Sequence, residues 1–541
     1  MTRKLKYGIF ALLLGWSCTE IAAQPRLPEV DPKVKEDPMF QLQKLNQFYR
    51  YLNGTYVDTL HNDQLVEKAI QAMLLQLDPH STYLTQEEMK ESEEMFTEGS
   101  FSGIGIEFNI LNDTVIVVNV IAGGPSEQVG LLPNDRIVSA DGKSIVGTKL
   151  LDVPKILRGP KGTRINIGVV RHGEPDTLDF SIVRDDIPIY TVDAAYKVDS
   201  TTGYIRINRF ANNTFKEFLE AYQKLQPIDA LILDLRSNGG GLLGQAIELS
   251  NFFLPKSNLI VSMEGMRIPH DEARATHNGE FLKGKVIVLT NETSASASEI
   301  VSGALQDWDR ALIIGRRTFG KGLVQQQIPL MDGSAVRLTV ARYHTPTGRV
   351  IQRPYHNGDL KGYEEDFFKR FESLEDSVSV DSTLMFKTLR SGRTVYGGGG
   401  ITPDILVQYD TTEYSNYLTS MVRKGLLNEY AVSYMDRNRD KLAKQYPTFE
   451  TFNRDFQVTD KMLSELTELA TQRDIEFNQT EFDRSARLIR AQLKALIAQK
   501  LWGINEYYII MNAEFDETFD KAFDVLKNWD QYGDPDGTIH P

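Results

Sequence analysis

Two short runs of the sequence hold side chains that could act as a nucleophile and its base. In Thr293 to Ile300, Ser296 stands among small residues, and Phe319 to Gln325 contains Lys321. A hydroxyl is a poor nucleophile near neutral pH, so it needs a positioned base. A lysine amine can serve when burial lowers its pKa from about 10.4 towards roughly 7 to 8. The two runs predict a serine nucleophile, Ser296, and a lysine base, Lys321.

Neighbouring residues predict the rest of such a site. The segment after Lys321 has an extended pattern, so the side chains of Lys321 and Gln325 point to one side, and Gln325 is expected to orient the amine. A glycine turn follows the apolar segment 230–235, and its backbone N–H groups can point at an anion. We expect Gly239 or Gly240, together with the N–H of Ala297 at a helix N-terminus, to form an oxyanion hole.

Other chemistries fit the sequence less well. Gly315 to Lys321 satisfies most of the P-loop pattern, but Gly322 stands where a hydroxyl must bind magnesium, and a strand pattern follows instead of a helix. No histidine lies in a recognisable triad context, and no G-x-S-x-G, H-E-x-x-H or cysteine cluster occurs. We therefore predict no metal and no cofactor. A noncatalytic peptide-binding scaffold is the alternative from another class, against which the intact Ser296, Lys321 and Gln325 argue.

The elements that must position these residues change in type along the chain. Residues 39–98 have helical spacing, with a stop at Asp78 to His80, where His80 is expected to form local hydrogen bonds. Residues 99–183 have short strands and glycine turns that resemble a PDZ domain, which adds a peptide to a sheet edge and binds its terminal carboxylate. Four residues match the carboxylate-binding loop: Ser102, Gly103, Ile104 and Gly105.

The rest of the chain has two regions, one with alternating strand and helix patterns and one with a helical pattern throughout. Residues 184–410 alternate apolar strands with helices, which predicts an α/β core with crossover connections. Within it, 354–396 is charged and irregular and is expected to be a surface insertion. Residues 411–541 have a helical pattern. The sequence therefore predicts a multidomain α/β protein with an inserted mostly-β PDZ domain and helical N- and C-terminal regions.

Composition and the N-terminus indicate class and compartment. The chain has 541 residues, enough for several domains, and its formal net charge of −14 argues against binding to nucleic acid. Residues 1–23 have the basic, apolar and small-residue layout of a signal peptide, and a proline-rich linker, 24–38, follows. Cleavage near Ala23 would remove Cys18, whereas the alternative makes Cys18 a lipidated N-terminus. We expect an exported protein of the periplasm or cell envelope.

Together these residues resemble the carboxy-terminal processing peptidases, also called tail-specific proteases, over about 45–410. The resemblance rests on the PDZ signature and on Leu77 to Ser81, Leu157 to Thr163, Asp234 to Gly241, Ser294 to Glu299, Gln306 and Asp307, Phe319 to Gln325, Tyr343 to Gly348, and Gly400 to Ile405. It implies a serine endopeptidase with a crotonase-like core, in which Ser296 is the nucleophile, Lys321 the base and Gln325 its support.

The resemblance also implies partners and further site residues. Substrates would be proteins or peptides with accessible C-terminal tails, which the PDZ domain presents while it gates the active site, with Arg158 as a candidate coupling residue. Glu299 and Asp307 match positions linked to function, and their alternative roles are helix capping and structural pairing. The insertion and the C-terminal helices depart from the family pattern. The insertion is expected to cover or tune the substrate path, and the C-terminal helices leave open a homodimer or docking to an envelope adaptor.

Overall fold

The computed structural model describes residues 31–111, 113–121, 123–133, 135–171, 174–372, 384–408 and 410–540. The predicted signal peptide and Cys18 therefore lie outside the described residues. The chain divides into two compact units, Met1–Ile70 and Gln71–Pro541. Among the residues described, no helix combines the length and apolarity needed to cross a membrane.

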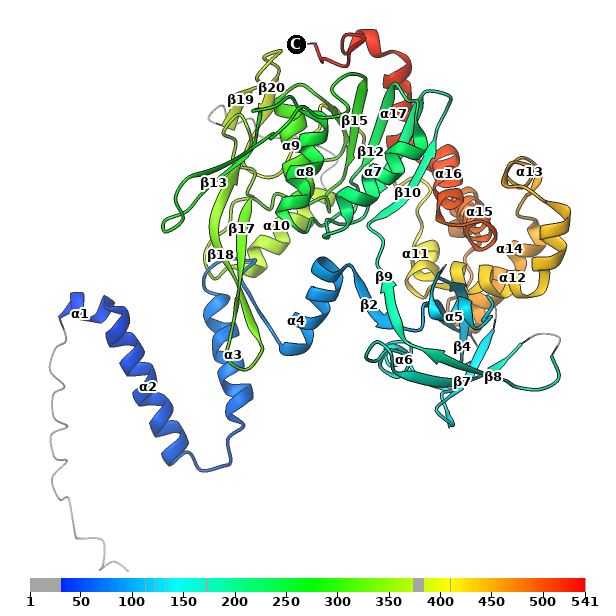
Figure 1. Cartoon of the computed structure of the whole chain (residues 1–541), viewed down its shortest axis with the longest axis horizontal. Coiled ribbons are helices and arrows are strands. Elements are labelled where there is room, and N and C mark those ends of the chain that lie inside the picture. Colours follow the sequence, from blue (N-terminus) through cyan, green and yellow to red (C-terminus); the bar gives the residue numbers. More distant parts are fainter. Residues whose placement is uncertain are drawn as a thin grey trace, which may run out of the picture. The chain divides into compact units, whose positions relative to one another are not determined.

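In the first unit, the described residues form helices and connecting turns. Helix α1 (Pro32–Glu36) lies within the predicted linker, α2 (Pro38–Thr55) follows, and α3 (Asn62–Leu74) runs across the boundary between the units (Figure 1). Asp31 and Asp37 cap α1 and α2 by accepting hydrogen bonds from the first turn. No residue of α2 is buried.

The α/β core predicted from the alternating pattern is confirmed. Its sheet has the order β10 (Val192–Lys197), β11 (Thr202–Ile207), β12 (Ala230–Asp234), β15 (Lys285–Thr290), β16 (Leu312–Gly315) and β21 (Ile405–Leu406). All neighbours are parallel except β10, which pairs antiparallel with β11. Both faces are covered, so every residue of β12 is buried.

Different helices cover the two faces of this sheet. Helices α7 (Thr214–Leu225), α8 (Leu243–Phe253) and α9 (Ala297–Asp307) share a core with Leu231 and Leu233 (Figure 1). Ile232 points to the other face, where α17 (Glu517–Lys527) packs. The strand period thus places the two cores on opposite sides of β12.

A second sheet holds the segment after Lys321. Its order is β1 (Thr82–Leu84), β18 (Ala335–His344), β13 (Leu259–Glu264) and β14 (Asp271–Arg274), and β17 (Leu323–Pro329) forms a hairpin with β18. Helix α4 (Gln86–Ser92) and the π-helical turn η1 (Glu93–Glu98) follow β1. The strands β2 (Ser100–Gly103) and β9 (Asp185–Pro188) pair with each other at the two ends of the predicted PDZ domain.

The predicted PDZ region is a separate antiparallel sheet. It contains β3 (Ile106–Leu111), β4 (Thr114–Val120), β5 (Arg136–Ala140), β6 (Lys143–Ser144), β7 (Arg164–Val170) and β8 (Leu178–Val183), with helices α5 (Pro125–Gln128) and α6 (Val153–Leu157). Val115 and Val117 face the interior of this region. Ile116 and Val118 alternate with them and pack instead with Val432.

Val432 belongs to the C-terminal helices. These are α11 (Asn416–Arg423), α12 (Leu426–Gln445), α13 (Phe449–Asp455), α14 (Asp460–Gln472), α15 (Gln479–Leu501) and α16 (Ile504–Phe515). Most of them share one apolar core. The chain then returns to the α/β core, because α17 and the short 3-10 helix Trp529–Gln531 bury side chains against the second face of its sheet.

The stretch 354–396 differs from the prediction of an irregular surface insertion. It contains helix α10 (Leu360–Glu372) and a hairpin of β19 (Met385–Lys387) and β20 (Thr394–Tyr396). Tyr363 and Val395 are buried. The many charges of this stretch suggested a surface segment, but Tyr363 and Phe367 have the i, i+4 spacing of one helix face.

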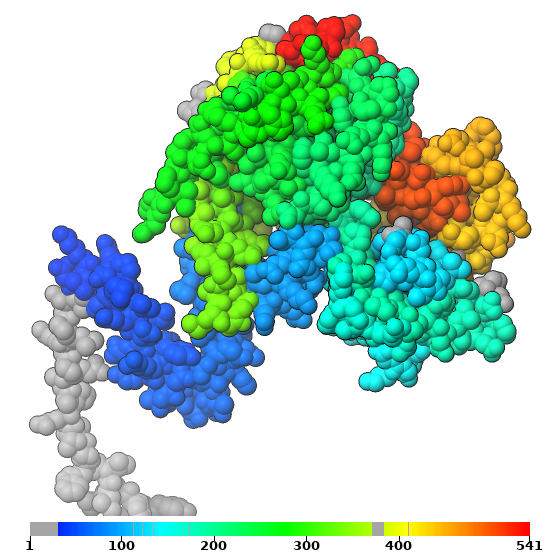
Figure 2. Space-filling model, in the orientation of Figure 1, coloured from blue at the N-terminus to red at the C-terminus, as the bar shows by residue number. Residues whose placement is uncertain are grey.

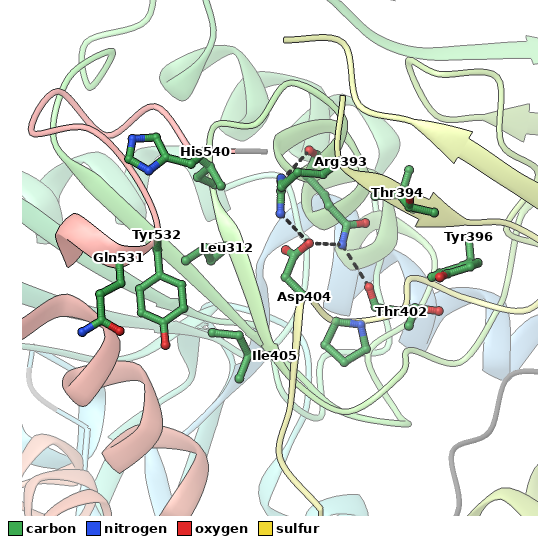
Figure 3. A pocket seen from close by; sticks show the side chains of 14 residues that line it. Leu312, Arg393, Thr394, Tyr396, Thr402, Asp404, Ile405, Gln531, Tyr532 and His540 are labelled. Atoms are coloured by element: carbon green, nitrogen blue, oxygen red, sulfur yellow. Dashed lines mark hydrogen bonds and ion pairs between the residues drawn. The ribbon is translucent and has the colours of Figure 1, made fainter. Parts of the chain in front are cut away.

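A cavity of about 350 Å³ lies between this hairpin and the C-terminal segment, and both contribute residues to its lining (Figure 3). Arg393 donates to Asp404, and Gln306 donates to the same carboxylate at 3.1 Å. Tyr532 and His540 line the cavity from the C-terminal segment. Figure 2 shows this segment (red) beside the described part of the insertion (yellow). None of the predicted nucleophile, base or oxyanion residues lines the cavity.

Candidate active site

Ser296 lies at the N-terminus of α9, after the loop that leaves strand β15. Its backbone has φ 55° and ψ −111°, a conformation that L-residues rarely adopt. Such strain costs on the order of 1–3 kcal/mol and persists only where surrounding contacts enforce it. The flanking residues Ala295 and Ala297 are small and buried, which keeps the turn tight.

The glycine turn after β12 lies directly against this turn. A Cβ on Gly240 would lie 2.8 Å from Ser296 Cβ and 2.9 Å from Ala297 N, so only glycine permits the contact. The Gly240 N–H donates to Asn238 Oδ1 at 2.9 Å, so Gly239 is favoured among the two predicted alternatives, Gly239 or Gly240. Gly239 has open space around it. The candidate donors are therefore Gly239 and Ala297, whose N–H opens the first turn of α9.

Glu299 connects the turn of Ser296 with the turn of Lys321. Its carboxylate Oε2 accepts hydrogen bonds from Ser296 N and Lys321 N, each at 2.8 Å. Oε1 accepts from Gly320 N at 2.8 Å and from Thr318 Oγ1 at 2.5 Å. Burial raises the pKa of Glu299, and these donors oppose the rise. Of its two predicted roles, the contacts describe the structural one.

Tyr343 of β18 makes a second connection between the same two turns. Its buried hydroxyl lies 3.2 Å from the Ser296 carbonyl oxygen and also contacts the carbonyl oxygen of Lys321. Two buried polar groups therefore join the turn that carries the predicted nucleophile to the turn that carries the predicted base. The connection through Tyr343 was not predicted, because Tyr343 carries no sequence signal beyond its place in a motif of the resemblance.

The Lys321 amine is held by Gln325. Lys321 Nζ donates to Gln325 Oε1 at 2.9 Å, the contact that the strand period predicts, although the ladder has a bulge between Val324 and Gln325. Burial lowers the pKa of Lys321, and the nearby Arg337 guanidinium lowers it further, whereas Glu299 and Asp78 raise it. The net direction is downward, which favours the neutral amine that a base requires.

An aromatic cluster lies beside Lys321, and sequence reasoning did not predict it. His80 Nε2 is 3.1 Å from the Tyr363 hydroxyl of α10, and the His80 ring packs edge-on against Phe319. The Arg353 guanidinium lies 3.7 Å from the centre of the Tyr363 ring. Burial, Lys321 and Arg353 lower the pKa of His80 to about 4, while Asp78 opposes them, so this imidazole is neutral at neutral pH.

A groove in the predicted PDZ region has a volume of about 280 Å³. Its lining includes Gly103, Ile104 and Gly105, three of the four residues predicted to bind a carboxylate. Ser102 does not line the groove, because successive residues of β2 face opposite sides and the groove takes Phe101 and Gly103. Ser102 Oγ is instead buried with no hydrogen-bond partner among the described residues.

The last two predicted residues lie in different places. Arg158 lines the groove, where its guanidinium is 4.1 Å from the centre of the Phe101 ring, and it forms an ion pair with Glu94 of η1 at 3.6 Å. Asp307 lies at the other end of α9 from Ser296 and forms a buried ion pair with Arg349. It also accepts hydrogen bonds from Thr347, so its contacts are structural.

Comparison with known proteins assigns a class to this fold and site. A model of peptidase family S41 matches residues 201–361, and a PDZ domain model matches 102–182. The N-terminal domain of the activating protease CtpB matches 8–88, and a family of unknown function matches 417–503. The chain is thus a serine-type peptidase with a PDZ domain.

Individual relatives narrow the class. The chain is 42% identical to the carboxy-terminal-processing protease of Bartonella bacilliformis, over 65% of this chain and 81% of that protein. It is 36% identical to the carboxy-terminal processing protease CtpA of Bacillus subtilis, over 61% and 70%. A solved photosystem II D1 C-terminal processing protease is 27% identical over 71% of this chain and 90% of that chain, with a TM-score of 0.37. This chain belongs to the carboxy-terminal processing proteases.

Proposed function

We propose that the protein cleaves polypeptides near their C-terminal tails by a Ser/Lys acyl-enzyme mechanism. The observation that carries this proposal is the Lys321 amine, which has a lowered pKa, is held by Gln325, and is tied through Glu299 to the turn of Ser296. A protein or peptide tail would bind in the PDZ groove as an added strand. The N–H groups of Gly239, in the turn after β12, and of Ala297, in the first turn of α9, support the position of an oxyanion.

In the proposed mechanism, Lys321 takes up one proton and gives it back in each half of the reaction. Ser296 Oγ attacks the peptide carbonyl carbon while Lys321 takes the hydroxyl proton, and Gly239 and Ala297 donate to the oxyanion. The C–N bond then breaks as Lys321 gives that proton to the leaving amine, which leaves an ester on Ser296. Water, deprotonated by Lys321, cleaves the ester and regenerates the enzyme. Each oxyanion donor contributes about 3 to 4 kcal/mol.

The first experiment compares the parent protein with Ser296→Ala and Lys321→Ala on an unstructured protein that ends in an apolar tail. Cleavage is followed by mass spectrometry, with the exposed Lys361→Ala as the matched control. Each active-site variant should lose at least about a thousandfold in kcat/KM, because nucleophile and base act as a unit. Equal cleavage by the parent and both variants would rule out the Ser/Lys assignment.

We also propose that the protein is exported to the cell envelope and is homodimeric. The signal-peptide layout of 1–23 supports export, and mass measurement of the mature N-terminus separates cleavage near Ala23 from lipidation of Cys18.

Apolar side chains at helical spacing along α2 support a second copy of the chain as the partner, since Met39 and Phe48 are each 60% exposed. Light scattering of the parent and of Phe48→Asp would measure the molecular mass in solution and so test for the dimer. An envelope adaptor is a further proposed partner.

A further inference from the structure

The turn between α3 and β1 is organised around one carboxylate. Asp78 Oδ1 accepts hydrogen bonds from His80 N and Ser81 N, each at 2.9 Å, and Oδ2 accepts from Ser81 Oγ at 2.6 Å. Asp78 and Ser81 are both buried. A helix stop alone does not require this, because a chain end at the surface can leave the same groups to water. The burial indicates a more specific role.

The same carboxylate is bonded to the strand opposite Gln325. Thr339 Oγ1 donates to Asp78 Oδ1 and Thr339 N donates to Ser81 Oγ, each at 3.0 Å. In the β17–β18 ladder, Thr339 is the direct partner of Gln325, at the point where the ladder changes register. Asp78 therefore attaches its turn to the sheet at the residue that faces Gln325.

The attached turn presents a backbone acceptor to Gln325. Gln325 Nε2 donates to the His80 carbonyl oxygen at 2.5 Å, and Gln325 Oε1 accepts from Lys321 Nζ at 2.9 Å. A side-chain amide has one donor end and one acceptor end. Because the His80 carbonyl can only accept, it binds the NH₂ end and turns the oxygen towards the lysine amine.

We propose that Asp78 is a positioning residue for the Lys321 base and acts through the His80 carbonyl and the Gln325 amide. The proposal rests on the Ser/Lys mechanism proposed above. Asp78 touches neither substrate nor reacting atoms in this role. It holds the acceptor that sets the orientation of Gln325, and Gln325 in turn directs the amine of Lys321.

A double-mutant cycle on the full-length protein tests the proposal. Asp78→Asn keeps the size of the side chain but replaces one acceptor oxygen by a donor. It should lower kcat about tenfold or more with little change in KM, because a misplaced base affects the chemical step. In a Gln325→Ala background, the same change should cost less than about twofold, since its route of action is gone. Equal losses in both backgrounds would overturn the proposal.

The pH profile separates positioning from general loosening of the site. The charged and titratable groups around Lys321 include Glu299 on α9, Arg337 and Tyr343 on β18, and Asp78 and His80 of the turn. Removing the negative charge of Asp78 lowers the pKa of Lys321, so the acid limb of kcat/KM should move to lower pH in Asp78→Asn. A site opened to water would move the limb to higher pH, and that result would contradict a positioning role.

Controls distinguish the possible failures. Asp332 accepts hydrogen bonds from Ser334 N and Oγ in an exposed hairpin turn, so Asp332→Asn removes the same chemistry elsewhere and should keep activity within about twofold. If Asp78→Asn does not fold, Thr339→Val removes one of the bonds to Asp78 and should show the same non-additivity with Gln325→Ala. Full activity of Lys321→Ala would refute both proposals, whereas additive losses with an inactive Lys321→Ala would refute only this one.

Discussion

At the scale of single residues, a buried carboxylate and a phenol hold the candidate site together. Glu299 accepts four hydrogen bonds, two of them from the amides of Ser296 and Lys321. The helix that carries Ser296 and the loop that carries Lys321 are therefore fixed by one side chain. Removing an acceptor from such a buried set leaves donors unsatisfied, which costs about 1–3 kcal/mol for each donor.

Glu299→Gln should consequently impair both folding and cleavage. The amide replaces one acceptor oxygen by a donor that opposes backbone N–H groups, so we expect a loss of about 2–3 kcal/mol in the free energy of unfolding. Activity should fall about a hundredfold, because the nucleophile and base lose their common support. Urea unfolding and kcat/KM measure the two effects. Unchanged activity would show that Tyr343 alone is sufficient to align the two turns.

The pH dependence of cleavage follows from the charges around Lys321. Only the neutral amine can accept the serine proton, so kcat/KM falls as pH falls through the pKa of Lys321. The Arg337 cation lowers that pKa. Arg337→Gln should raise it and move the acid limb to higher pH, whereas Arg342→Gln, on the same strand, should leave the limb in place. A limb that moves to lower pH in Arg337→Gln would contradict this account.

At the scale of elements, α10 supports the loop that carries Lys321. Its Tyr363 contacts His80 and lies under the Arg353 guanidinium, which also faces Phe319 at 5.0 Å. A stretch that looks like a charged insertion therefore packs against His80 and Phe319, which lie beside the base. Deleting this helix would expose the aromatic cluster to water and raise the pKa of Lys321 by hydration.

Two aromatic residues of α10 provide a matched comparison. Tyr363 is 6% exposed and Phe368 is 62% exposed. Tyr363→Ala should cost about 3 kcal/mol in the free energy of unfolding, because it leaves a cavity between α10 and the loop of Phe319. Phe368→Ala should cost less than about 0.5 kcal/mol. Equal effects in thermal or urea unfolding would show that α10 is not packed as described.

At the scale of the whole molecule, the C-terminal helices connect two other regions of the second unit. Val432 of α12 packs with Leu111, Ile116 and Val118 of the PDZ sheet, and Arg136 pairs with Asp436 at 3.0 Å. This partly buried ion pair contributes about 1 kcal/mol, so the apolar contact dominates. In the proposed function the PDZ groove presents the substrate, and this contact would then constrain how the tail is delivered.

A charge placed in that contact should release the PDZ sheet. Val432→Asp would bury an unpaired carboxylate, so we expect the helix to separate from the sheet and hydrogen exchange in β4 to increase. Val422→Asp changes a residue of α11 that is 53% exposed and should leave the exchange of β4 unaltered. Increased exchange in both variants would indicate general destabilisation instead of a specific contact.

Local sequence determined the class of this protein and the candidate residues for its chemistry. A serine before a helix, a lysine before a strand and glycine turns after apolar runs are short-range patterns. They made the α/β core and the PDZ domain predictable, and they selected Ser296 and Lys321 as candidates. The contact between Lys321 and Gln325 was predictable for the same reason, because both residues lie within one extended segment.

Only the tertiary structure decided which distant residues meet. The bonds from Asp78 to Thr339, from Gln325 to His80 and from Glu299 to Lys321 join residues that no helical or strand period relates. It also decided that Gly240 is bonded to Asn238, that Ser102 faces away from the groove, and that α10 is packed. Periodicity reports one face of one element, whereas a buried polar group is satisfied by whichever chain packs against it.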